Sequence, residues 1–135
     1  MFSKKEIVDL ASQAHSEFIK KHKVNCKISL VSLNEFWNLA KKSKLVQADI
    51  KQKIPLKIGA IVLHSKKDVI CLNQEILNQI ANDPDFVKAI VIHELYHVLL
   101  KNKVKEDSLN EEVKSENRVD DYLTKEFPNY SKFFI

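Results

Sequence analysis

The chain has few of the residues on which several protein classes depend. It contains one glycine, two cysteines, one methionine and a single arginine, Arg118, in 135 residues. Cys26 and Cys71 are far apart and outside any CxxC motif, so we expect buried thiols rather than a disulfide. The net charge of +4 comes almost entirely from lysine. Because nucleic-acid surfaces favour arginine, we expect no nucleic-acid partner.

Long hydrophobic runs are also missing. Charged residues at positions 4, 5, 6 and 9 interrupt the start of the chain, so we expect no signal peptide. No segment reaches the roughly 18 uninterrupted apolar residues of a membrane-spanning helix, so we expect no membrane partner. A hydrophobic content of 44% is sufficient for one core. We therefore expect a single domain over residues 1–135 in the cytoplasm.

The most informative stretch is HELYH, at residues 93–97, inside an otherwise apolar run. On a helix, His93 and His97 lie one turn apart on the same face, and Glu94 lies about 100° further round. The run 82–84, Asn-Asp-Pro, supplies an N-cap and an N1 proline, which predicts a helix from Pro84 to about Lys101. Buried polar side chains need compensating partners. The pattern therefore predicts a Zn²⁺ site in which Glu94 takes a proton from water.

The remaining elements follow from periodicity and turn signals. Helices are expected over 3–22, 33–43, 74–81 and 109–126, and strands over 26–31, 57–64 and 69–72, with the last two strands forming a β-hairpin. Ser3 and Ser108 each begin a capping-box pattern. His15 and His22 have no partner at ligand spacing and are expected to be exposed. The pattern predicts an α+β fold.

A catalytic zinc site usually takes three protein ligands and keeps one position open. No histidine follows the HELYH run, and the only methionine is the first residue, so families with a downstream histidine ligand or a methionine turn are excluded. The candidates for the third ligand are Glu116, which we favour, and Glu112, Glu111 and His64. If Glu116 is the ligand, Asp120 lies one turn further on, where it can hydrogen-bond a ligand imidazole.

HELYH followed by Glu116-Asn117-Arg118-Val119-Asp120 resembles the HExxH and ExxxD signature of gluzincin metallopeptidases. The resemblance covers roughly residues 58–123. The closest match in size is the minigluzincins, which are akin to the catalytic cores of CAAX-prenyl-protease-type and heat-shock-type membrane peptidases. It implies a zincin-like fold, in which a small antiparallel-containing β-sheet packs on an active-site helix and a following glutamate helix. It also implies zinc bound by His93, His97 and Glu116, with Glu94 as general base and acid in peptide hydrolysis.

The resemblance gives the predicted hairpin a role in binding a peptide or protein substrate. In zincins the edge strand of a sheet above the cleft pairs with the extended substrate, and the residues at that position are Ala60, Ile61, Val62, Leu63 and His64. Residues 69–72 correspond to the next strand inward. The candidates for stabilising the oxyanion are Arg118, Tyr122 and Tyr130.

The apolar tail, residues 129–135, permits three interpretations. It packs on the core, which we favour, or it covers the cleft of a latent zymogen, or it joins a homodimer interface. Two other functions also fit the motif: an intracellular regulatory HExxH domain that acts on one dedicated protein partner, and a non-catalytic zinc-stabilised binding module. Because a binding module needs no general base, Glu94 favours catalysis.

Overall fold

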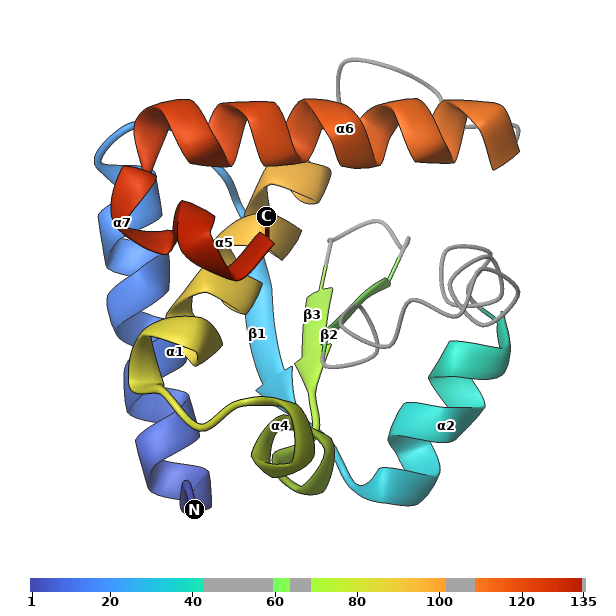
Figure 1. The fold of residues 1–135 in the computed structure, drawn as a ribbon. Helices are drawn as coiled ribbons and strands as arrows, with labels where there is room; N and C mark the ends of the chain where they lie inside the picture. Colours follow the sequence, from blue (N-terminus) through green and yellow to red (C-terminus); the bar gives the residue numbers. More distant parts are fainter. Residues whose placement is uncertain (43–59, 64–68, 102–108, 135) are drawn as a thin grey trace.

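The computed structural model describes residues 1–42, 60–63, 69–101 and 109–134, with side chains in these ranges except at 39–42, 60–63, 101, 109–117 and 134. The described chain is a mixture of helix and strand in which helix predominates (Figure 1). Its elements are α1 (Lys4–Ile19), β1 (Lys27–Leu30), α2 (Leu33–Lys42), β2 (Ala60–Leu63), β3 (Val69–Leu72), α4 (Gln74–Ile80), α5 (Pro84–Lys101), α6 (Leu109–Glu126), α7 (Pro128–Ser131) and the 3-10 turn η2 (Lys132–Phe134). The mixed α and β composition expected from the sequence is therefore confirmed.

Side-chain caps explain where three of the helices begin. Ser3 accepts a hydrogen bond from the backbone N–H of Glu6, whose carboxylate accepts one from the backbone N–H of Ser3, so the predicted capping box of α1 is confirmed. Asn73 accepts from the backbone N–H of Ile76 at the start of α4. At the start of α5, Asp83 accepts from the backbone N–H of Asp85. Residues 102–108, with the predicted cap at Ser108, lie outside the described residues.

The strands form a three-stranded sheet in the order β1-β3-β2. β2 pairs with β3 in antiparallel register, with Ala60 opposite Leu72 and Leu63 opposite Val69. β1 pairs with the other edge of β3 in parallel register, with Lys27 opposite Val69. In the described sheet β3 is therefore central and β2 is an edge strand. The predicted ends of this hairpin strand, 57–59 and His64, lie outside the described residues, as does the predicted turn 65–68.

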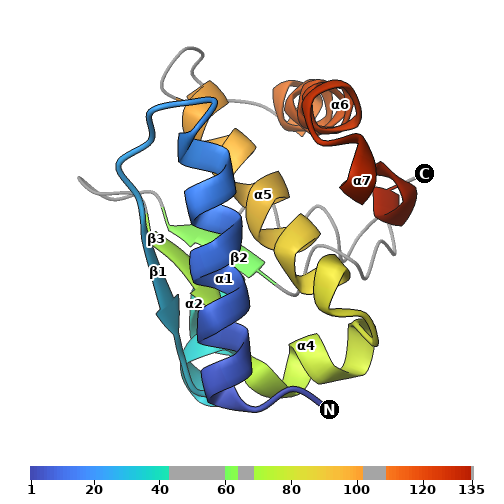
Figure 2. The same cartoon turned by 90° about the vertical axis from the view of Figure 1, so that its left-hand side faces the viewer.

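One cluster of buried apolar side chains joins α1, α5, α6, α7 and the sheet. Figure 2 shows α1 and α5 side by side, with the strands beyond them and α6 near the end of α5. In β3, Ile70 and Leu72 belong to this cluster. Cys26 and Cys71 form no disulfide in the structure, and Cys71 is buried as expected, whereas Cys26 is partly exposed. Of the helices in the described ranges, none combines the length and hydrophobicity needed to cross a membrane.

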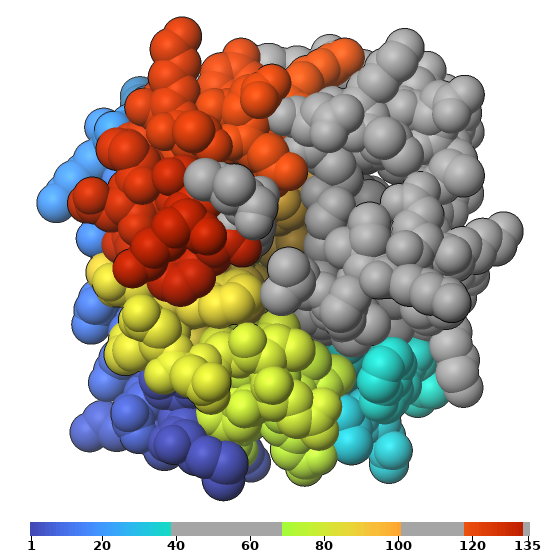
Figure 3. Space-filling model, in the orientation of Figure 1, coloured from blue at the N-terminus to red at the C-terminus, as the bar shows by residue number. Residues whose placement is uncertain are grey.

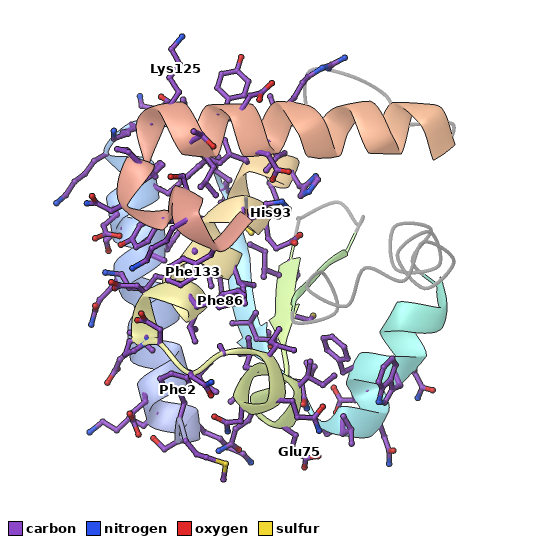
Figure 4. All side chains as sticks on the ribbon, in the orientation of Figure 1. Phe2, Glu75, Phe86, His93, Lys125 and Phe133 are labelled. Carbon is purple, nitrogen blue, oxygen red and sulfur yellow. The ribbon has the colours of Figure 1, made fainter. Side chains whose placement is uncertain are left out.

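The C-terminal tail packs on the rest of the domain. Phe133 stacks on Phe86 at the start of α5 (Figure 4), with ring centroids 4.9 Å apart. Tyr130 is buried. The Tyr130 hydroxyl donates a 2.8 Å hydrogen bond to Glu17 of α1, which also pairs with Lys88 of α5 at 3.3 Å. In Figure 3, α7 and η2 form a continuous surface with the first turns of α5. The favoured interpretation, packing of the tail onto the core, is therefore confirmed for Tyr130 and Phe133.

Candidate metal centre

The candidate metal centre is built on α5, which lies in the interior, because its residues 86–100 are all buried or partly buried. Leu95 and Ile92 are fully buried, and so is Tyr96, one of the two spacers of the motif. Since the helix is enclosed by α1, α6 and the sheet, its polar residues are carried inside with it. His93 and Glu94 are each 2% exposed, which is unusual for residues of this polarity.

The spacing of the motif places its polar groups together. The rings of His93 and His97 lie with centroids 4.9 Å apart at an interplanar angle of 67°. One ligand atom from each of His93, Glu94 and His97 can be chosen so that all three lie within 4.8 Å of one another. The Nδ1 atom of His93 is 3.4 Å from Oε1 of Glu94. The other carboxylate oxygen of Glu94, Oε2, is buried and has no hydrogen-bond partner in the described part of the chain.

Asp120 reaches the same place from α6, which crosses the C-terminal half of α5 (Figure 1). Its Oδ1 atom lies 3.2 Å from Nε2 of His93. This oxygen is buried, although the side chain as a whole is 38% exposed. The contact satisfies the distance for an ion pair but not the angles of a hydrogen bond. Sequence spacing and structure thus agree that Asp120 adjoins a motif histidine.

The favoured third ligand, Glu116, lies on α6 one turn before Asp120. Its side chain is outside the described part of the structure, and so are those of Glu111 and Glu112. His64, the upstream alternative, lies outside the described residues altogether. The choice among these ligands therefore stays a prediction.

Four of the five residues expected to bind peptide lie on β2, the edge strand that contacts α5. Ala60 through Leu63 form this strand, and their role in substrate binding stays a prediction. Of the oxyanion candidates, Tyr130 directs its hydroxyl to Glu17 on α1. Arg118 and Tyr122 are exposed on α6, on the element that carries Asp120.

Sequence reasoning missed a second polar cluster, which packs against α5 around Tyr96. Oε1 of Glu126, in the last turn of α6, accepts a 2.7 Å hydrogen bond from the Tyr96 hydroxyl and lies 2.8 Å from Nε2 of His22. The neighbouring Lys21 donates to the backbone carbonyl of Glu126 at 2.6 Å. The expectation that His22 is exposed was wrong, because the chain after α1 folds back against α5 and α6; His15 is likewise only partly exposed. No spacing rule connects these residues.

The electrostatics of this cluster follow from burial and from its hydrogen bonds. Burial, followed by the hydrogen bond to Glu126, raises the pKa of the Tyr96 hydroxyl, which therefore stays protonated and acts as a donor. At Glu126, burial raises the pKa, but hydrogen bonds from Tyr96 and His22 and the charge of Lys21 together outweigh it, so the net pKa is lowered. The carboxylate of Glu126 is therefore ionised at neutral pH.

This shift predicts an acid-dependent loss of stability. A carboxylate whose pKa is lower in the folded state stabilises the protein above its unfolded pKa, and the stabilisation is lost as the pH falls through the folded value. We expect Glu126→Gln to lower the free energy of unfolding at pH 7 by about 1–2 kcal/mol. The difference from wild type should shrink below about pH 4.5. Urea denaturation at several pH values checks this, and a difference independent of pH would contradict it.

The donor set suits a borderline metal ion. Two imidazoles one helical turn apart, with carboxylates beside them, are the ligand types that zinc takes in proteins. The buried and unpartnered Oε2 of Glu94 fits the same interpretation, because an isolated buried carboxylate oxygen is costly without a positive partner. The residues present therefore fit a zinc ion.

Comparison of the chain with protein-family models, with curated proteins and with solved structures found no match.

Proposed function

We propose that this protein is a zinc-dependent metallopeptidase of the gluzincin type with a zincin-like fold. The observation that carries the proposal is the buried group of His93, Glu94 and His97, whose ligand atoms lie within 4.8 Å of one another. A buried helix seldom carries two histidines and a glutamate without a ligand that compensates for their polarity. The contact between Asp120 and His93 supports the proposal, because metal-binding imidazoles are commonly adjoined by a carboxylate.

Each residue has a distinct role in the proposed reaction. His93 and His97 would hold a zinc ion with Glu116 as the third ligand, and Asp120 would orient the ring of His93. A bound zinc ion would supply Lewis acidity toward a peptide carbonyl and toward water. Glu94 accepts the proton of the attacking water and gives it to the leaving amine. The burial of Glu94 holds its carboxylate beside the histidines, so little reorganisation precedes the proton transfer.

The edge strand β2 supplies a place for an extended peptide. An edge strand offers backbone N–H and C=O groups that an added strand can pair with. β2 lies at one edge of the described sheet and contacts the helix that carries the motif. A peptide or protein substrate therefore pairs with 60–64 and passes its scissile bond over α5 in this proposal.

A second candidate, a non-catalytic zinc-stabilised binding module, is favoured by one observation. His93, Glu94 and His97 are only 2%, 2% and 6% exposed, which restricts access of a substrate to the ion. A structural zinc site is closed, whereas a catalytic site keeps a position for water. The two candidates differ in turnover, so hydrolysis separates them.

Zinc content per chain tests the ligand set. We expect purified wild-type protein to hold one zinc ion, Glu116→Ala to lose it, and Glu112→Ala to keep it. The reason is that a two-histidine site without its carboxylate ligand binds zinc much more weakly, whereas Glu112 adds only charge. Elemental analysis after dialysis gives the content, and casein hydrolysis is assayed on the same samples.

Each result has a definite meaning. Loss of zinc from Glu112→Ala instead of Glu116→Ala would indicate that the third ligand is Glu112, one turn earlier on α6. Full zinc content without hydrolysis in the wild type would favour the binding module. A wild-type protein that binds no zinc would contradict both candidates.

A further inference from the structure

We propose that Tyr96 and Glu126 are positioning residues of the metal centre, because their hydrogen bond holds α6 in the place from which Asp120 reaches His93. The inference rests on the proposed function and assigns a role to the polar cluster around α5. In this inference neither Tyr96 nor Glu126 is a ligand of the ion.

The first step is that Tyr96 fixes the rotation of α5 about its own axis. The ring is fully buried and lies edge-on to Phe18 at 4.9 Å, near Phe127 at 6.1 Å and stacked with Tyr122 at 5.9 Å. Its neighbour in sequence is His97, and His93 lies three residues before it. Because Tyr96 and both histidines belong to one hydrogen-bonded helix, any rotation of the helix at Tyr96 also moves both histidines.

The second step is that Glu126 joins the end of α6 to two other parts of the chain. Its Oε1 atom accepts from Tyr96 of α5 at 2.7 Å and lies 2.8 Å from Nε2 of His22, and its backbone carbonyl accepts from Lys21. The last turn of α6 is thereby attached both to the segment after α1 and to the middle of α5. An ionised carboxylate with two donors on one oxygen makes a stronger contact than a neutral pair.

The third step is that α6 contacts α5 through a second polar pair. Asp120 Oδ1 lies 3.2 Å from His93 Nε2, and Asp120 precedes Glu126 by six residues, about 9 Å along the helix. Beside the apolar packing of Val119 and Leu123, these two polar contacts, at Asp120 and Glu126, fix the relative rotation of the two helices. Loss of the contact at Glu126 therefore lets α6 move as a rigid body, and Asp120 and the backbone of Glu116 move with it.

The structure contains a matched control. Tyr130 is also a buried tyrosine whose hydroxyl donates to a glutamate, Glu17, at 2.8 Å. That pair joins α7 to α1 and does not involve α6. Tyr96→Phe and Tyr130→Phe thus remove the same chemical group from similar surroundings, and only the first removes a contact between the helices of the metal centre.

The test measures zinc affinity by competition with a chromophoric chelator, and the visible spectrum of the Co²⁺-substituted protein. We expect Tyr96→Phe to weaken zinc binding by about tenfold, as is typical when the support of a metal ligand is lost, and to change the Co²⁺ spectrum. We expect Tyr130→Phe to bind zinc as wild type does. Glu126→Ala should weaken binding at least as much as Tyr96→Phe, and the conservative Glu126→Gln should recover part of the loss.

Two results would overturn the inference while leaving the proposed function intact: wild-type affinity in Tyr96→Phe, or an equal loss in Tyr130→Phe, which would indicate a general effect of stability. A wild-type protein that binds neither zinc nor Co²⁺ would overturn the proposed function, and the inference with it.

Discussion

Glu94→Gln is expected to keep zinc and to lose peptide hydrolysis by about 10²–10⁴-fold, the range for removal of a general base. Glutamine has the shape of glutamate but cannot accept the proton of the attacking water. Because Glu94 is 2% exposed, a substitution of equal volume is the one that leaves its packing in place. The measurement is the rate of casein hydrolysis, normalised to zinc content.

The matched control is Glu75→Gln, the same substitution at an exposed residue of α4, remote from His93 in Figure 4. It is expected to hydrolyse casein at the wild-type rate. A Glu94→Gln protein as active as wild type would remove Glu94 from the mechanism. Loss of zinc from Glu94→Gln would instead show that the glutamate is itself a ligand, which the buried Oε2 atom makes physically reasonable.

The parts of the fold that depend on local chemistry could be predicted from the sequence. α5 begins and ends where the N1 proline and the apolar run place it, at Pro84 and Lys101. α1 has the capping box that Ser3 and Glu6 predict. The parallel pairing of β1 with β3 could not be predicted in this way, because no turn residues specify which strand a distant strand will join.

In the candidate site, too, local sequence predicts some features and leaves others to tertiary contacts. The approach of His93 and His97 follows from a spacing of four residues on a helix, which requires no tertiary information. Asp120 could be placed near the histidines only because its spacing from Glu116 suggested a shared face. Glu126 carries no such signal, since its partner Tyr96 occupies a spacer position of the motif and His22 is more than a hundred residues away in sequence.

Phe18→Ala is expected to lower the free energy of unfolding by about 3–5 kcal/mol, the usual cost of removing a buried aromatic ring. Phe18 is fully buried and packs edge-on to Tyr96 and stacked on Phe127, at 4.9 and 6.2 Å. It therefore lies where α1, α5 and the end of α6 meet. Alanine leaves a cavity that the rigid aromatic neighbours cannot fill. The protein therefore loses both the free energy of burying the ring and the packing contacts around it.

Urea denaturation gives the free energy, and Ile19→Ala is the control because it removes an apolar side chain from the next position of the same helix. Ile19 is 46% exposed, so its loss is expected to cost about 0.5 kcal/mol or less. Domains of this kind are stable by about 5–15 kcal/mol, so the Phe18 variant should lose a large part of the total. Equal effects at the two positions would contradict the packing of α1 against α5, because that packing buries Phe18 and leaves Ile19 partly exposed.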